Sequence, residues 1–278
     1  MSAPNIISIE KLVRLIGTPR CPILVDVRPP NVFEADPHLV PSSFHCGFDE
    51  IADEMADRIG KRGEQSAIVI CQNGTSLSQG AAALLRDQGI SAEVLEGGLE
   101  AWRQEKLPLV PFAKLPPFDT RGRTVWVTRA RPKIDRIACP WLIRRFVDPR
   151  AAFLFVAPSD VVEVAERFGG VPFDIENVFW SHRGGTCTFD TMIEEFELGT
   201  PPLLRLARMV RGADTARPEL SPQAPGLLAA SLGLSRMYSD DLEQLEAGML
   251  LYDALYRWSR DATEETHNWP TNKPRPLK

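Results

Sequence analysis

Apolar and polar positions follow two different patterns in the first third of the chain. Three short apolar runs predict buried strands, at residues 23–27, 67–71 and 92–95. Residues 48–59 and 78–88, which lie between these runs, carry apolar side chains at helical spacing. Strands separated by helices predict an α/β domain whose parallel sheet is covered by helices on both faces.

Prolines mark the end of this pattern. The segment 107–118, LPLVPFAKLPPF, contains four prolines, which argue against a helix or a central strand there. We therefore predict a first domain at residues 1–110 and an extended, proline-rich linker at residues 111–122.

The second half is predicted to be a mainly helical α+β domain at residues 123–262. A strand is expected at 125–128 and a helix somewhere between 135 and 147. Apolar stripes at helical spacing predict three more helices, at residues 202–211, 223–236 and 240–260. Residues 263–278 are polar and contain prolines, which predicts a flexible tail.

Composition narrows the functional classes. The chain has 278 residues with 32 basic and 37 acidic side chains, a net charge of −5 that argues against a general nucleic-acid binder. We expect a cytoplasmic protein without membrane contact, because no apolar run is long enough for a span and the start has no signal-peptide pattern. The cysteines stand singly, which argues against a disulfide framework and a structural zinc site: Cys21, Cys46, Cys71, Cys139 and Cys187.

Cys71 is the strongest candidate nucleophile. It ends the predicted strand at 67–71, and in parallel sheets ligands bind beyond the carboxyl ends of the strands. Loop N–H groups and a helix N-terminus can stabilise a thiolate and hold an anion. The candidate anion cradle is the loop of Gln72, Asn73, Gly74, Thr75, Ser76 and Leu77. A buried structural cysteine is the alternative interpretation.

Three motifs occur in order along this half. VDVRPPNVFEADPHLVPSS contains an Asp-x-Arg element at Asp26 and Arg28, followed by His38-Leu39-Val40-Pro41; VICQNGTSLSQGAAALL and VLEGGLEAW come later. Together, over about residues 6–110, they resemble the rhodanese family. The resemblance implies a sulfurtransferase in which Cys71 forms a persulfide and its loop stabilises the anionic sulfur.

Two features of the loop depart from that family. Many rhodaneses carry an arginine or lysine in the loop, whereas this loop has no charged residue. Ser78, the expected helix start, lies seven residues after Cys71, one more than in a compact sulfur-transfer loop. A longer loop resembles the phosphatase and arsenate-reductase branch, although Leu77 stands where that branch has an arginine. Oxyanion chemistry and an inactive or regulatory module are therefore alternatives.

The second half begins with a strongly basic stretch. Residues 121–150 contain nine basic and two acidic side chains, which predicts either solvated arginines or a concave anion site. Pro140 is tolerated in the first turn of a helix, so Cys139 is predicted at or just before a helix N-terminus, where the dipole would lower its pKa. The alternative is that Cys139 is packed in the core.

A histidine, a cysteine and carboxylates gather further on, in WSHRGGTCTFD at 180–190. Gly184-Gly185 predicts a turn that would bring His182 near Cys187. His182, Asp190 and Asp214 are candidate ligands for a metal ion, the one candidate cofactor in this chain. A structural, hydrogen-bonding histidine is the alternative.

This half also resembles a known family. IDRIACPWLIRRFVDP, SHRGGTCTFD, VRGADT and LLYDALY are similar to the C-terminal domain of ChrB-type chromate resistance proteins, over about residues 123–260. The resemblance implies chromate resistance or chromate-responsive regulation. It places a candidate site at Asp135, Arg136, Cys139, His182 and Cys187. Some relatives carry a His-Glu pair where this chain has Arg211-Gly212, so a metal site that needs that histidine would be incomplete here.

The leading hypothesis is a sulfurtransferase fused to a chromate-resistance domain that binds an oxyanion, a metal or a thiol acceptor. The expected partners are a small sulfur donor, a thiol acceptor and chromate. One alternative is a chromate-responsive sensor or regulator with a non-catalytic rhodanese module. Another makes the second domain a metal-dependent redox enzyme.

Overall fold

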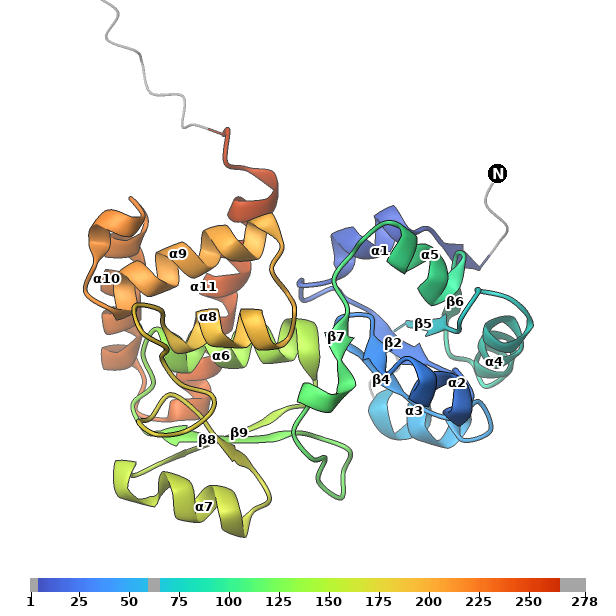
Figure 1. The fold of residues 1–278 in the computed structure, drawn as a ribbon, viewed down its shortest axis with the longest axis horizontal. Coiled ribbons are helices and arrows are strands. Elements are labelled where there is room, and N and C mark those ends of the chain that lie inside the picture. The colour runs from blue at the N-terminus through green and yellow to red at the C-terminus, as the bar shows by residue number, and fades with distance from the viewer. Residues whose placement is uncertain (1–4, 60–65, 266–278) are drawn as a thin grey trace, which may run out of the picture.

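The structure, a computed structural model, describes residues 5–59 and 66–265. Its two halves lie side by side, with strand β7 (Val110–Pro111) between them (Figure 1). Most of the predicted tail at 263–278 lies outside the described residues. No helix in the described ranges combines the length and apolar character that crossing a bilayer requires.

The first half contains a five-stranded sheet in which every neighbouring pair is parallel. The strand order is β1 (Ile6–Ile7), β6 (Ala92–Leu95), β5 (Ala67–Ile70), β2 (Ile23–Asp26) and β4 (Ser43–His45). Successive side chains face opposite sides, as a strand requires: Ile68 joins one core cluster and Val69 another. The predicted α/β architecture is confirmed.

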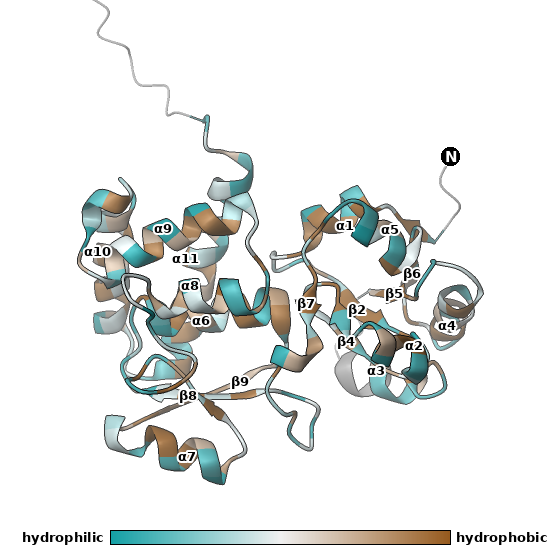
Figure 2. Ribbon diagram, viewed as in Figure 1, coloured by the Kyte–Doolittle hydropathy of each residue, from teal (hydrophilic) through white to brown (hydrophobic). Residues whose placement is uncertain are grey.

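Helices cover both faces of this sheet. Leu12 of α1 (Ile9–Leu15) and Trp102 of α5 (Gly98–Gln104) belong to the core of one face. Met55 of α3 (Ile51–Ile59) and Leu85 of α4 (Ser76–Asp87) belong to the core of the other. The short helix α2 (Pro30–Ala35) follows β2. Hydrophobic residues concentrate on the central strands of both halves (Figure 2).

The second half is an α+β region, as predicted. It contains a three-stranded parallel sheet with the strand order β10 (Val171–Pro172), β8 (Val125–Arg129) and β9 (Ala152–Val156). The helices are α6 (Asp135–Leu142), α7 (Val161–Arg167), α8 (Thr188–Glu195), α9 (Pro201–Asp214), α10 (Ala224–Met237) and α11 (Asp241–Asp261). Asp240 caps α11 by accepting hydrogen bonds from two backbone N–H groups of its first turn.

Two helix boundaries differ from the predictions in ways that matter for function. α4 begins at Ser76 rather than Ser78, because Gly74, with φ +66°, turns the chain at once after Cys71. α6 begins at Asp135 and continues through Cys139 and Pro140 into a π-helical turn at Ile143–Val147. Pro140 therefore lies inside the helix rather than in its first turn.

The proline-rich segment is docked against the protein. β7 pairs antiparallel with β3 (His38–Leu39), and a short 3₁₀ helix follows at Phe112–Lys114. One core cluster contains residues of both halves, including Trp102 and Trp141. The position that a Cβ on Gly17 would occupy is 2.4 Å from the Phe146 ring, so the halves approach each other closely there.

Candidate functional sites

The structure places Cys71 directly after β5, at the carboxyl end of the sheet, with 4% of its surface exposed. The chain then turns through Gln72 to Thr75, and Ser76 and Leu77 form the first turn of α4. The Cys71 thiol donates a hydrogen bond to the Ser78 hydroxyl, with Sγ and Oγ 3.1 Å apart. Ser78, fully buried, was missed as a site residue, since from the sequence it was read only as the start of a helix.

The surroundings favour the thiolate of Cys71. Burial acts to raise its pKa, but hydrogen bonds outweigh it and the net pKa lies below the usual value. The Ser78 hydroxyl contributes most to this lowering, followed by backbone N–H groups of Ser78, Thr75 and Asn73. The Ser78 hydroxyl and the backbone amides therefore supply the positive potential that an arginine or lysine supplies in other loops of this kind.

The motif VLEGGLEAW contacts the cysteine loop and holds it in place. The N–H of Leu99 donates to the carbonyl of Cys71 at 3.0 Å, and the N–H of Glu100 donates to that of Gln72 at 2.9 Å. A Cβ on Gly98, whose φ is +62°, would lie 2.3 Å from the Cys71 carbonyl oxygen and 2.5 Å from the Gly74 nitrogen. Only glycine fits there, which explains the second glycine of VLEGGLEAW.

The Asp-x-Arg element has a structural role. Arg28 is fully buried and its guanidinium lies 2.7 Å from the Asp26 carboxylate. Its remaining donors reach the carbonyls of Asp36 and His38, which ties the segment after β2 to the segment before β4. Such a buried, fully hydrogen-bonded pair fixes the backbone on the edge of the sheet next to the cysteine loop.

A second cluster lies in the other half, around His182. Its Nε2 atom is 3.4 Å from Asp135 Oδ2, 3.4 Å from Asp174 Oδ1 and 3.2 Å from Asp214 Oδ2. Ligand atoms of Asp135, His182 and Asp214 all lie within 4.8 Å of one another, a spacing that suits a metal ion. These groups come from the start of α6, the loop after β10, the turn before α8 and the end of α9.

Helix α8 and two arginines hold these carboxylates in place. The Thr188 N–H donates to Asp135 Oδ2 at 2.6 Å and its hydroxyl donates to Asp174 Oδ1 at 2.9 Å. Arg129 and Arg136 lie 3.2 and 3.3 Å from Asp174 Oδ2. The sequence analysis did not identify Asp174, Arg129 and Thr188 as site residues, because only the tertiary structure brings them to His182.

The charges in the cluster are strongly coupled. The nearby carboxylates of Asp135, Asp174 and Asp214 raise the pKa of His182 to about 12. Burial, together with the neighbouring charges of Asp214 and Asp174, raises the pKa of Asp135 to about 7, although His182 acts in the opposite direction. Burial opposes ionisation of Asp174 too, but hydrogen bonds from His182 and Thr188 leave its pKa below the usual value.

Two predictions about this half need correction, those for Cys139 and Asp190. Cys139 is fully buried inside α6, and burial raises its pKa well above the usual value, so the prediction of an activated thiol is wrong. Cys187 is equally buried and its pKa is also raised, with burial the main cause. Asp190 does not reach His182 but pairs with Arg211 and accepts from the Cys187 N–H, so it does not belong to the candidate metal set.

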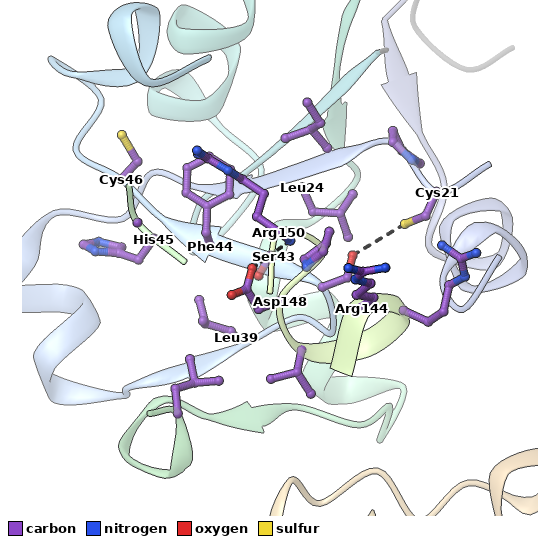
Figure 3. Close-up of a pocket in the computed structure, with 18 of the residues that line it drawn as sticks. Cys21, Leu24, Leu39, Ser43, Phe44, His45, Cys46, Arg144, Asp148 and Arg150 are labelled. Atoms are coloured by element: carbon purple, nitrogen blue, oxygen red, sulfur yellow. Dashed lines mark hydrogen bonds between the residues drawn. The ribbon is translucent and has the colours of Figure 1, made fainter. Parts of the chain in front are cut away.

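Six arginines of the basic stretch at 121–150 form ion pairs, most of them with carboxylates distant in the sequence. Arginines within 4 Å of a carboxylate include Arg123, Arg129, Arg136, Arg144, Arg145 and Arg150. Three of them, Arg144, Arg145 and Arg150, line a pocket of about 690 Å³ between the halves. Their partners are Glu246, Asp253 and Glu54, at 2.5, 2.8 and 3.9 Å. Figure 3 labels Arg144 and Arg150.

Cys21 and Cys46 line the same pocket from the first half (Figure 3). Burial raises the pKa of Cys21 to about 11, although a hydrogen bond with Ser42 and the charge of Arg145 act against it. Because its arginines already face carboxylates and its Cys21 thiol is protonated at neutral pH, the pocket is a poorer match to an anion than the cysteine loop.

Comparison with known proteins assigns both halves. Residues 8–105 match the rhodanese-like domain family, and residues 126–259 match the family of the ChrB C-terminal domain. Thiosulfate sulfurtransferase GlpE of Pseudomonas syringae pv. syringae is 39% identical over 82 residues, which cover 29% of this chain and 72% of that protein.

Protein ChrB of Cupriavidus metallidurans is 34% identical over 142 residues, which cover 50% of this chain and 42% of that protein. The match thus spans less than half the length of Protein ChrB. Among solved structures, a rhodanese-related protein from Thermoplasma volcanium is 25% identical, with a TM-score of 0.31 over 37% of this chain and 95% of that one. The chain belongs to the rhodanese family through residues 8–105, and it joins that domain to a ChrB C-terminal domain at residues 126–259.

Proposed function

We propose that the chain is a sulfurtransferase in which Cys71 carries sulfur as a persulfide. The observation that carries this proposal is the position of the Cys71 thiol, directly after β5 and before α4, where it donates a hydrogen bond to Ser78. The lowered pKa of this thiol supports the proposal. The identity to thiosulfate sulfurtransferase GlpE supports the same chemistry. Gln72 to Leu77, together with Ser78, form the anion cradle.

The reaction has two displacement steps. In the first, the Cys71 thiolate attacks the outer sulfur of thiosulfate, an S–S bond forms to Cys71, and sulfite leaves with the electron pair of the broken S–S bond. In the second, an acceptor thiolate or cyanide attacks the outer sulfur and the Cys71 thiolate leaves. The N–H groups of Asn73, Thr75 and Ser78 stabilise the anionic sulfur in both steps, as preorganised donors do in an oxyanion hole.

The second domain indicates the process in which this activity would take part. Its similarity to Protein ChrB supports a role in chromate resistance, in which the domain binds an oxyanion, a metal ion or the thiol acceptor. The proposed partners are a small sulfane-sulfur donor, a thiol acceptor and chromate, in the cytoplasm. Nucleic acid is a poor fit, because ion pairs within the chain engage much of the basic stretch.

A thiosulfate-to-cyanide assay on the wild type and on Cys71→Ser tests the proposal. We expect the wild type to transfer sulfur and to gain the mass of one sulfur atom on Cys71, and Cys71→Ser to do neither. Cys21→Ser is the matched control, since Cys21 is a more accessible thiol outside the loop and its loss should leave transfer intact. A folded wild type with reduced Cys71 that neither transfers sulfur nor forms a persulfide would overturn the proposal.

A chromate-responsive sensor is the second candidate, favoured by the absence of a charged side chain from residues 72–77. In that case the rhodanese module would bind a ligand without turnover. Chromate-dependent, salt-sensitive DNA binding in a chain that forms no persulfide would establish it, because phosphate contacts release counterions.

A further inference from the structure

We propose that Asp135, His182 and Asp214 bind a divalent transition-metal ion, Mn²⁺ or Fe²⁺, with Asp174 bordering the site. The proposed function gives an oxyanion, a metal ion or a thiol acceptor as the ligand of the second domain, and the present inference rests on it only in choosing the metal ion. The set differs from the one predicted from the sequence in that Asp135 replaces Asp190.

The distances match the edges of a coordination polyhedron. Metal–ligand bonds of about 2.1 Å place neighbouring ligand atoms about 3.0–3.5 Å apart in octahedral or tetrahedral geometry. His182 Nε2 lies 3.4 Å from Asp135 Oδ2 and 3.2 Å from Asp214 Oδ2. These two distances suit ligands of one ion, and ligand atoms of all three residues lie within 4.8 Å of one another.

Hydrogen bonding alone accounts poorly for this arrangement. A histidine Nε2 carries at most one hydrogen, yet oxygens of three carboxylates converge on the Nε2 of His182. Charge-assisted N–H···O contacts are typically about 2.7–2.9 Å long, and all three distances here exceed that range. A cation among these groups would satisfy several oxygens at once.

Asp135 supplies an independent observation. Its side chain is completely buried, and within the described part of the chain its Oδ1 atom has no hydrogen-bond partner. A buried carboxylate without sufficient partners is strongly disfavoured, since neither water nor counter-charge compensates it. In the described structure His182 is the only cation source within 4 Å of Asp135, and a bound ion would provide the missing charge.

The surrounding groups resemble the outer shell of a metal site. Thr188 fixes one oxygen of Asp135 and one of Asp174 from the start of α8. Arg129 and Arg136 balance the charge of Asp174, which leaves Asp135 and Asp214 as the carboxylates without an arginine partner among the described residues. Outer-shell donors of this kind orient ligating carboxylates and tune their affinity.

The ligand chemistry indicates the kind of ion. Carboxylates suit Mg²⁺, Ca²⁺ and Mn²⁺, whereas imidazole suits Fe, Zn, Cu and Ni, so a mixed set with two carboxylates favours Mn²⁺ or Fe²⁺. The His182 side chain is 41% exposed, so the site opens to solvent on that side. Three protein ligands with an open side leave coordination positions for water or a substrate.

Binding of Mn²⁺ to the chelator-treated full chain tests the inference. The concentration of free Mn²⁺ is measured from its electron paramagnetic resonance signal in solution, which weakens when the ion is bound. We expect one equivalent to bind, and an equal concentration of Mg²⁺ not to displace it. His182→Gln and Asp214→Asn should weaken binding more than about 100-fold, since outer-shell partners alone account for roughly 10–100-fold. Both side chains are partly exposed, so these variants should fold.

Asp190→Asn is the matched control, because Asp190 lies in the same sequence stretch but pairs with Arg211. It should bind Mn²⁺ as the wild type does. The proposal is overturned if the folded wild type binds no Mn²⁺, if His182→Gln and Asp214→Asn bind it unchanged, or if Mg²⁺ displaces it at equal concentration. The measurement needs no sulfur donor, so it is independent of the outcome of the sulfur-transfer assay.

Discussion

The groups around Cys71 come from one run of residues, 71–78, whereas the cluster around His182 draws on four separate segments. In the first site the Ser78 hydroxyl and backbone N–H groups stabilise the thiolate, and their positions follow from a strand, a turn and a helix N-terminus. In the second, side-chain carboxylates surround His182, and packing of α6, α8 and α9 decides which of them meet. A site of the first kind can therefore be predicted from a local sequence pattern, whereas a site of the second kind can be identified only from the tertiary structure.

The variant with the largest expected effect tests whether the cysteine loop depends on contacts with the motif VLEGGLEAW. Gly98→Ala should reduce sulfur transfer to the level of Cys71→Ser, because its Cβ would collide with the Cys71 carbonyl and would require a strained backbone. The free energy of unfolding should fall by about 1–3 kcal/mol, as expected for overpacking. Denaturant unfolding and the thiosulfate assay measure both.

Gly80→Ala is the control for that variant, since a Cβ there meets nothing within 4 Å and Gly80 lies within α4. It should keep activity and add up to about 1 kcal/mol of stability, because alanine favours a helix more than glycine does. If Gly98→Ala stays active, the loop does not depend on the closing motif.

The next effect concerns the support of the carboxylate cluster. Thr188→Val removes the hydroxyl that bonds Asp174 but keeps the backbone N–H that bonds Asp135. We expect Mn²⁺ affinity to fall about 10–100-fold, as for other outer-shell partners. Thr215→Val, whose hydroxyl bonds the carbonyl of Arg211, should change the affinity little. Equal affinities in the two variants would mean that the Thr188 hydroxyl does not support the metal site.

A smaller effect is expected from the pH dependence of the thiol. Because hydrogen bonds hold the pKa of Cys71 below the usual value, its alkylation by iodoacetamide should remain fast at lower pH than for an unperturbed cysteine. Ser78→Ala removes the largest lowering contribution, so its alkylation profile should move to higher pH. Mass spectrometry of samples quenched at set times across a pH series measures the alkylation rate. If Ser78→Ala and the wild type have the same pH profile, the backbone N–H groups alone lower the pKa of Cys71.

The smallest effect concerns the joint between the halves. Lys114, in the docked linker, lies 2.6 Å from Glu195 of α8 and lowers the pKa of that carboxyl. Lys114→Met should lower the free energy of unfolding by about 1 kcal/mol or less, as is typical of partly exposed ion pairs. Lys11→Met, on an exposed part of α1, is the control, and a loss of several kcal/mol in Lys114→Met would show that this contact is central to docking.

Much of the fold follows from local patterns. The strands at β2, β5 and β6 lie within one residue of their predicted positions, because a buried parallel strand needs a continuous apolar run. The boundaries of α4 and α6 did not follow, since a positive φ at Gly74 and the tolerance of α6 for Pro140 depend on packing against the rest of the chain. The turn at Gly184-Gly185 forms, with Arg183 and Thr186 bridged, yet His182 turns to the carboxylates.

The sequence by itself determined the two families, the strand that ends at Cys71 and the loop that follows it, because contacts between residues close in the chain are set by local backbone geometry. Tertiary structure alone decided that Cys139 is buried, that the arginines of 121–150 meet carboxylates, and that Asp135 and Asp174 join His182 and Asp214. Those contacts join distant segments that come together when apolar faces of helices are removed from water, and no local pattern records where such faces meet.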